Sequence, residues 1–407
     1  MTTPDQTTSK KNHKLPLLAL IFLAIVLGIG AGYLFPLWLA RIFVTFNSIF
    51  SQFLGFVIPL LIVGLVAPAI IEIGKGAGKM LLFTVGLAYI ATICAGFFSY
   101  FTSVTFFPSL ISVNHYIEAS ENAVNLEPFF TIGMEPLMTV TSSLILAFTI
   151  GLCVASFAPS DSALRNVLID CRQVIIMVIK NVIIPLLPLY IFGIFLNMTI
   201  TGETGGILLN FIKVIGVIFV MHVVLLVVQF VVGALIDGKN PFRCLITMLP
   251  AYFTALGTSS SAATIPVTLR QAKKMGVDPD VADFTVPLCA TIHLSGSTLK
   301  IVACSLALMI VHGYHYDLSM YSGFIAMLGI TMVAAPGVPG GAIMAALGIL
   351  SSMLGFTDAD NALMIALYIA MDSFGTACNV TGDGAISLIV DRFFGNKKVK
   401  STVAESV

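Results

Sequence analysis

The chain has 407 residues, of which 58% are hydrophobic and only 10% are charged. A water-soluble domain carries roughly a quarter charged residues, so this composition predicts that lipid surrounds most of the surface. Twenty basic residues balance twenty acidic ones, and this balance gives no indication of nucleic acid as a partner. The seven cysteines have neither paired nor metal-type spacing, which argues against a disulfide framework.

A polar N-terminal stretch precedes the first apolar run, and no convincing cleavage site follows that run. We therefore interpret the run as a retained membrane helix rather than a removed signal peptide. A bilayer core requires about 20 apolar residues per helix. The runs that meet this requirement are Leu15–Phe35, Arg41–Ile73, Met80–Phe107, Leu137–Phe157, Val174–Met198, Ile207–Leu235, Phe284–Val311 and Ala362–Val390. The sequence predicts an all-α integral membrane protein with about eight transmembrane helices.

Two further apolar segments, Asn240–Leu269 and Gly323–Phe356, are interrupted in the middle. Residues 257–261 (Gly-Thr-Ser-Ser-Ser) break the first, and residues 336–341 (Pro-Gly-Val-Pro-Gly-Gly) break the second. Backbone that leaves the helix at membrane depth is tolerated only where protein or a water-filled cavity satisfies it. Two opposed re-entrant helical hairpins account for both segments; the alternative is two packed helices that Gly and Pro merely kink. Paired interrupted segments are the best sequence indication of a transporter's midplane binding site.

The positions of lysine and arginine agree with this topology. Residues 80–164, which include the second predicted outside loop, contain no lysine or arginine. A re-entrant first hairpin keeps the basic cluster at residues 270–274 inside, so we expect a multi-pass protein of the cell membrane with both termini cytoplasmic. The expected regions are a tail (1–14), mainly the first six helices (15–236), a transport core with both hairpins and the last two helices (237–395), and a second tail (396–407).

Four motifs lie in the second half of the chain, at residues 258–268, 287–292, 337–343 and 379–383. They read Thr-Ser-Ser-Ser-Ala-Ala-Thr-Ile-Pro-Val-Thr, Pro-Leu-Cys-Ala-Thr-Ile, Gly-Val-Pro-Gly-Gly-Ala-Ile and Asn-Val-Thr-Gly-Asp. Each is weak alone, but in this order the four resemble the dicarboxylate/amino acid:cation symporter family, which has the glutamate-transporter fold. The resemblance covers nearly the whole chain. It implies a homotrimer in the bilayer, with a central scaffold and a transport domain that carries substrate by an elevator movement.

The resemblance implies a substrate site between the hairpins and the last helix. Asp372 occupies the position that binds the α-amino group of the substrate. A carboxylate at bilayer depth costs about 2.5–3.5 kcal/mol to insert and normally has a cationic partner; the alternative is an aspartate satisfied by neighbouring hydroxyls. Thr376 and Asn379 continue the same helical face. The other implied contacts are Ser259, Ser260 and Ser261, at the first hairpin's tip near the α-carboxylate, and Gly337 and Val338, at the second tip, which closes over the ligand.

One departure from the family concerns the substrate side chain. Carriers of glutamate and aspartate place an arginine three residues after the amine-binding aspartate, and here that residue is Gly375. A buried carboxylate without this arginine would be unpaired, at a cost of several kcal/mol. Asp372 together with Gly375 therefore indicates a neutral amino acid, because Gly375 leaves volume rather than charge. Ser297 is placed to donate one hydrogen bond to the substrate side chain.

Sodium ions prefer hard oxygen ligands. The resemblance implies one sodium site at Asn379, Asp383 and the backbone near Cys289 and His293. A second site would use carbonyl groups near Thr291 and near residues 334–335 of the second hairpin.

The third sodium site of the family depends on an Asn-Met-Asp segment that here reads His-Leu-Ser at residues 293–295. Tyr89 and Thr92 keep the spacing of its partners on the third helix, but the following serine position is Ile93. Because neutral oxygens alone would hold sodium only weakly, we expect this third site to be lost.

Lys300 lies two turns after His293 in the predicted seventh helix, too deep to reach water easily. Its ammonium should pair with a carboxylate or titrate. One interpretation is a coupling residue, a built-in cation or proton carrier that replaces a lost sodium, with His293 as its partner. The other is a structural ion pair or a lysine that faces the aqueous path, and the sequence leaves both open.

The sequence predicts a secondary active symporter that couples inward sodium flux, with or without protons, to uptake of a neutral α-amino acid. The alternatives are a carrier of dicarboxylates or acidic amino acids and an anion channel. The motifs His-Glu-x-x-His and Gly-x-Ser-x-Gly and a paired-aspartate arrangement are all missing from the sequence, which argues against an intramembrane enzyme.

Overall fold

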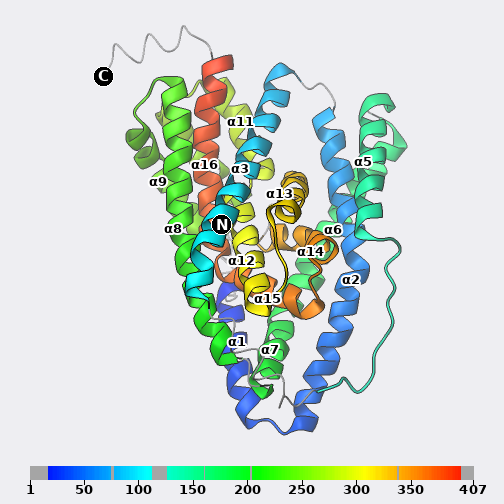
Figure 1. Cartoon of the computed structure of the whole chain (residues 1–407). Coiled ribbons are helices and arrows are strands. Elements are labelled where there is room, and N and C mark those ends of the chain that lie inside the picture. Colours follow the sequence, from blue (N-terminus) through cyan, green and yellow to red (C-terminus); the bar gives the residue numbers. More distant parts are fainter. Residues whose placement is uncertain are drawn as a thin grey trace, which may run out of the picture.

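The computed structural model describes residues 17–74, 78–111, 126–159, 161–201, 204–336 and 339–395, and each element in these ranges is helical (Figure 1). The predicted tails, 1–14 and 396–407, lie outside the described residues. The all-α prediction is confirmed. The helices of the first half are α1 (Leu17–Leu34), α2 (Leu37–Gly74), α3 (Lys79–Leu110), α5 (Val140–Phe157), α6 (Ala163–Val178), the π-helix η1 (Ile179–Ile183), α7 (Ile184–Ile200) and α8 (Thr204–Asp237).

The described residues contain five helices that are long and apolar enough to cross a membrane. These are Leu37–Ile71, Lys79–Leu110, Ala163–Ile200, Asn210–Asp237 and Pro279–His312. A sixth span results if the bent pair Asp358–Ala370 and Asp372–Phe394 is taken together. The first and fourth predicted runs are helical as well, but their apolar helices, Ala19–Leu34 and Ile145–Phe157, are shorter. The total of about eight spans therefore stays a prediction.

Both interrupted segments form two helices that pack against one another. The first segment contains α9 (Pro241–Thr258) and α10 (Ser261–Lys274), and the second contains α13 (Leu318–Val333) and α14 (Gly341–Leu354). The breaks fall in the serine-rich and the glycine- and proline-rich stretches that the sequence marked. Each segment is a helix–break–helix unit, as expected for a hairpin.

The last two apolar runs, each predicted as one membrane span, are each divided into two helices by a break that was not predicted. Phe284–Val311 is divided into α11 (Pro279–Ile292) and α12 (Ser295–His312), and Ala362–Val390 is divided into α15 (Asp358–Ala370) and α16 (Asp372–Phe394), with a bend of 62°. Neither break contains a glycine or a proline. The new helix start at α12 is instead stabilised by a distant side chain, since Oδ1 of Asn379 accepts the N–H of Gly296 at 2.7 Å.

The helices contact one another in two groups. Helices α1, α2, α5, α6 and α7 contact mainly each other, whereas α3 and α8 pack with the later helices α9 to α16 (Figure 1). Helices α14 and α15 provide most contacts between the groups, against α1, α2, α5 and α7. The second group therefore includes elements from both halves of the sequence and surrounds α12.

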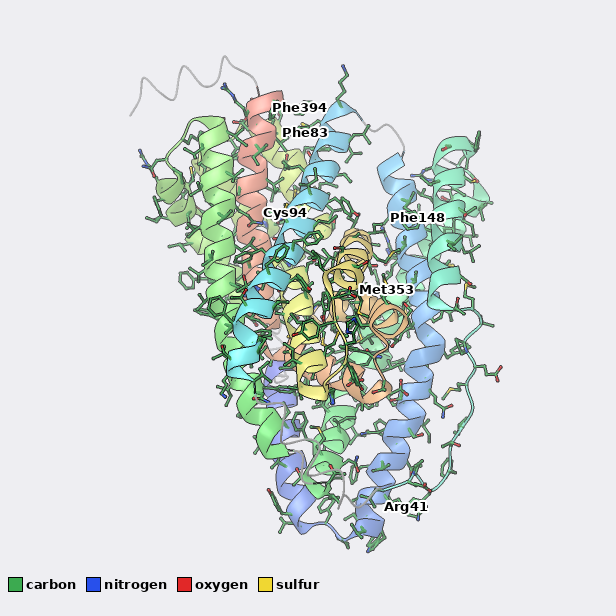
Figure 2. All side chains as sticks on the ribbon, in the orientation of Figure 1. Arg41, Phe83, Cys94, Phe148, Met353 and Phe394 are labelled. Carbon is green, nitrogen blue, oxygen red and sulfur yellow. The ribbon has the colours of Figure 1, made fainter. Side chains whose placement is uncertain are left out.

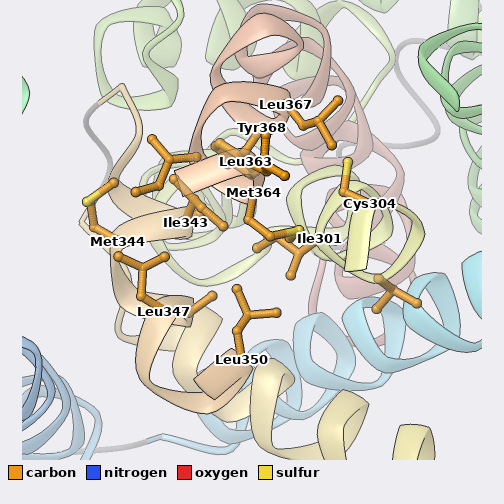
Figure 3. Close-up of a cluster of buried hydrophobic side chains, with 14 of the residues drawn as sticks. Ile301, Cys304, Ile343, Met344, Leu347, Leu350, Leu363, Met364, Leu367 and Tyr368 are labelled. Atoms are coloured by element: carbon orange, nitrogen blue, oxygen red, sulfur yellow. The ribbon is translucent and has the colours of Figure 1, made fainter. Parts of the chain in front are cut away.

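Helix α12 forms the centre of the second group, because every residue from Ser295 to Val311 is buried. Figure 3 shows Ile301 of α12 packed beside Ile343 and Leu347 of α14 and Met364 of α15. In a membrane the surrounding lipid is as apolar as these side chains, so close packing, rather than escape from water, holds the helices together.

The outer face of the chain is apolar, as a lipid environment requires. Phe22, Trp38 and Phe157 are 68%, 62% and 86% exposed. Figure 2 shows Phe83 and Phe394 together at the opposite end of the molecule from Arg41, and their rings lie 5.5 Å apart. The fully buried polar and charged side chains described below are therefore exceptions within an apolar molecule.

Candidate substrate-binding site

Asp372 is the first residue of α16 and follows the break at Met371. Only 7% of the residue is exposed. The backbone N–H of Gly340 donates to Oδ2 at 2.9 Å, and the ammonium of Lys300 lies 3.5 Å from Oδ1. Gly340 lies at the tip of the second hairpin with a φ of +73°, a conformation that favours glycine. The carboxylate therefore connects α12, α16 and the second hairpin.

Lys300 is fully buried, and its ammonium has three neighbours. It donates to the carbonyl of Met371 at 3.2 Å, lies beside Asp372, and stands 3.7 Å from the centre of the Tyr368 ring, a cation–π contact. A Cβ added to Gly375 would lie 2.5 Å from Nζ, so the lysine fills the space beside this glycine. The expectation that Gly375 leaves volume without charge was wrong, because residue 300 supplies the charge from another helix.

The tip of the first hairpin has a strained backbone at Ser259. Its φ of 49° makes it the one residue other than glycine with positive φ among the described residues. Its hydroxyl is hydrogen-bonded to that of Ser373 at 2.6 Å, which ties the tip to α16. Ser260 caps α10, since its Oγ accepts the N–H of Ala263 at 3.3 Å, and Ser261 is the buried first residue of that helix. Hydroxyl groups and the start of a helix thus lie opposite Asp372.

A cavity of about 710 Å³ lies where these elements meet. Its polar lining consists of Thr258, Ser259, Asp372 and Ser373, and its apolar lining includes Ile21, Phe22 and Ile25 of α1 and Pro339 of the second hairpin. One acid and two serines therefore face a shared space, and the part of its lining that the structure describes contains no lysine or arginine. This arrangement suits a small zwitterion, with the ammonium at Asp372 and the carboxylate at the hydroxyl groups.

Three other predicted contacts lie deeper than the cavity lining. Thr376 and Asn379 are buried on α16 beyond Gly375, and Oγ of Ser297 accepts hydrogen bonds from the Tyr368 hydroxyl and from Nδ2 of Asn379, each at 3.0 Å. Direct contact of these residues with a substrate stays a prediction. Gly337 and Val338 lie outside the described residues.

Asn379 and Asp383, the predicted sodium ligands, have partners within the protein. His293 is fully buried, and its Nδ1 lies 2.9 Å from Oδ1 of Asp383. Oδ1 of Asn379 accepts the N–H of Gly296 and that of Ser297. One interpretation of the sequence made His293 the partner of Lys300. In the structure His293 pairs with Asp383 instead. Two of the three carboxylates of α16, at residues 372 and 383, each pair with a side chain from residues 293–300.

The ligands expected for the second sodium site come together. Thr291, Ala334 and Ala335 line one cavity of about 340 Å³ with Pro336 at the second hairpin. The carbonyl of Cys289, assigned to the first site, accepts the N–H of His293 at 2.9 Å. The backbone around the end of α11 is therefore partly committed to the helix and partly open to this cavity.

The residues expected at the third sodium site are engaged in other contacts. The hydroxyl of Tyr89 donates to the carbonyl of Ala326 at 3.2 Å, and that of Thr92 donates to its own helix. Oγ of Ser295 accepts a hydrogen bond from Gln229 at 3.1 Å. Of these three hydroxyl groups, that of Ser295 accepts from a protein donor, whereas those of Tyr89 and Thr92 donate to carbonyl groups.

The sequence profile of the sodium:dicarboxylate symporter family matches residues 17–393, which include both hairpins and both broken helices. The chain belongs to this family. Its members are transporters and not enzymes, and they reside in membranes as multi-pass proteins. The predicted resemblance is therefore confirmed, and so is the expectation that the protein is not an enzyme.

Individual family members are similar over most of their length. The serine/threonine transporter SstT of Acinetobacter baumannii is 28% identical over 401 residues, which cover 93% of this chain and 97% of that protein. The serine/threonine transporter SstT of Campylobacter jejuni is 28% identical over 416 residues, which cover 94% and 97%. The excitatory amino acid transporter 1 of Rattus norvegicus is 30% identical over 294 residues, which cover 69% of this chain and 52% of that transporter.

Several residues of the site were not predicted from the sequence. Tyr368 lies four residues before Asp372, so helical spacing could have indicated it. His222 and Gln229 are polar residues seven apart on the apolar helix α8, and both reach α12: Nε2 of His222 lies 3.1 Å from the carbonyl of Gly296. The hydrogen bond from the Gly340 N–H to Asp372 was not predictable from the sequence, because its donor is a backbone group.

Proposed function

We propose that the protein is a symporter that uses inward sodium flux to take up a neutral α-amino acid, with serine and threonine as the first candidates. The observation that carries this proposal is the placement of Asp372 and Ser259 on one cavity whose lining, within the described residues, contains no lysine or arginine. The carboxylate binds the ammonium of the amino acid, and the hydroxyl groups at the first hairpin bind its carboxylate. The names of the two serine/threonine transporters support the same substrate class.

The cavity disfavours dicarboxylates and acidic amino acids. Each of these substrates would bring a second carboxylate, and this group would need a cation inside the cavity. Lys300 cannot serve in its present position, because it lies behind Asp372 and is not part of the lining. Asp372 would repel the additional negative charge.

The transport cycle follows from the two groups of helices. We assign α1, α2, α5, α6 and α7 to a scaffold, and we assign the hairpins with α3, α8, α11, α12, α15 and α16 to a transport domain that moves as an elevator. The apolar outer face of the first group provides the surface for a homotrimer in the cell membrane. Sodium binds at the ligands near Asp383 and Thr291, while the third site of the family is lost because residue 295 is a serine where the family has a carboxylate.

Uptake into proteoliposomes tests this proposal directly. Radiolabelled serine should accumulate under an inward sodium gradient and not without one, and a proton gradient set separately tests whether protons contribute. Unlabelled threonine should compete with serine at lower concentration than aspartate or succinate. Sodium-driven accumulation of succinate in preference to serine would contradict the proposal, and a passive anion current without accumulation would identify a channel.

A further inference from the structure

Lys300 has the surroundings of a permanent partner for Asp372. Its ammonium lies among an oxygen of the carboxylate, the Met371 carbonyl and the face of the Tyr368 ring. All residues of α12 around it are buried as well. Gly375 is required for this position, since any side chain there would displace the ammonium.

The Lys300 ammonium and the cavity lie on different sides of the Asp372 carboxylate. Asp372 lines the cavity, whereas Lys300 does not. A substrate ammonium can therefore approach the carboxylate from the cavity while Lys300 stays on the side of α12. This geometry distinguishes Lys300 from a residue of the cavity wall that would bind the substrate itself.

The charges of the site follow from this geometry. The pair of Lys300 and Asp372 is neutral when the site is empty, and a zwitterionic substrate adds no net charge. Without Lys300, the empty site would carry an isolated carboxylate through the membrane, whereas the loaded site would still pair this carboxylate with the substrate ammonium. Removal of the lysine therefore penalises the empty carrier more than the loaded one, because an unpaired charge is disfavoured in a low-dielectric interior.

We propose that Lys300 is a built-in counter-cation of Asp372 that allows the empty transport domain to return across the membrane. This inference rests on the proposed function, because it requires a carrier that returns empty after it has released an amino acid. The residue acts through the carboxylate and does not bind the substrate. The carrier thus needs no cation from the opposite solution to neutralise Asp372 on its return.

The test compares net uptake with exchange for the full-length protein in proteoliposomes. Net uptake is measured with labelled serine and vesicles free of serine, and exchange is measured with vesicles that contain excess unlabelled serine. Exchange needs only the loaded carrier to cross, whereas net uptake also needs the empty carrier. For Lys300→Met we expect the ratio of net uptake to exchange to fall at least ten-fold.

Lys213→Met is the matched control, because Lys213 is an exposed lysine on α8 that donates to the carbonyl of Leu110. It should leave the ratio as in the wild type. A ratio in Lys300→Met that equals the wild-type ratio, whether both activities fall together or neither falls, would overturn the inference. Wild-type protein that shows neither activity with serine would instead contradict the proposed substrate, and the ratio would then be measured with the amino acid that the panel identifies.

A second variant keeps the test decisive if Lys300→Met does not fold. Lys300→Ala combined with Gly375→Lys returns the ammonium from α16, into the space that the shortened side chain vacates. Net uptake by this double variant within about five-fold of its exchange rate supports the inference. Exchange without net uptake by the same variant would refute it.

Discussion

The side chain of Lys300 occupies the space in which a side chain on Gly375 would begin, since a Cβ at residue 375 would lie 2.5 Å from its Nζ. The two positions, on α12 and α16, are therefore structurally coupled. Substitution at either one changes the surroundings of Asp372. This coupling determines which variants of the site will be informative.

Gly375→Ala should lower the stability of the protein by about 1–3 kcal/mol, because the methyl group overpacks a filled site. The same substitution in a Lys300→Ala background should be tolerated, since the competing side chain is shortened. Thermal unfolding in detergent of the two single variants and the double variant gives the coupling energy. Additive effects within about 0.5 kcal/mol would show that the two side chains do not compete for this space.

Gly375→Arg in the Lys300→Ala background should shift substrate preference toward aspartate. Without Lys300 the arginine would have space beside Asp372, and its long side chain would reach toward the cavity and provide a fork for a side-chain carboxylate. We expect aspartate to inhibit serine uptake at least ten-fold more strongly than in the wild type. Gly375→Arg alone should fold poorly. Unchanged inhibition by aspartate in the folded double variant would contradict the assignment of the pocket.

Asp372→Asn should reduce serine uptake at least 100-fold, which corresponds to about 2.8 kcal/mol at 1.4 kcal/mol for each factor of ten. The amide keeps the shape of the side chain but loses the charge that binds an ammonium. Size-exclusion chromatography verifies that the assembly is intact. Asp283→Asn, at an exposed aspartate that pairs with Lys273, is the control. Normal transport by Asp372→Asn would refute the substrate site.

Two variants of Ser259, at the tip of the first hairpin, distinguish the contribution of its hydroxyl group from that of its backbone conformation. Both Ser259→Ala and Ser259→Gly remove the hydroxyl that bonds to Ser373, but only glycine relieves the left-handed backbone conformation. Both variants should bind serine about ten-fold more weakly, and the alanine variant should be about 1 kcal/mol less stable than the glycine variant. Concentration dependence of uptake and thermal unfolding measure the two effects. Equal stability of both variants would show that the tip is not strained.

The number of coupled sodium ions should be smaller than for a glutamate carrier measured side by side. The oxygens at the expected third site already accept or donate hydrogen bonds within the protein, among them Oγ of Ser295. Reversal potentials under imposed sodium and pH gradients give the stoichiometry. A sodium count equal to that of the glutamate carrier would show that the third site is retained.

The helices and most of the breaks were predictable because their causes are local. Apolar runs of sufficient length, and the serine-rich and glycine- and proline-rich interruptions, directly encode spans and hairpins. The breaks at residues 293–294 and 371 were not predictable in this way. Their backbone groups are satisfied by residues distant in sequence, as Asn379 does for Gly296, so the local sequence carries no signal for them.

The sequence alone determined that the protein is helical and surrounded by lipid and that it contains two interrupted segments, and the family resemblance implied Asp372 as the amine ligand. Only the tertiary structure decided how the buried charges pair. Lys300 and Asp372 are 72 residues apart, and so the ion pair depends on how α12 packs against α16 and on the space at Gly375. Such a contact has no periodicity and no fixed spacing, because it arises from three-dimensional packing rather than from the chain's local conformation.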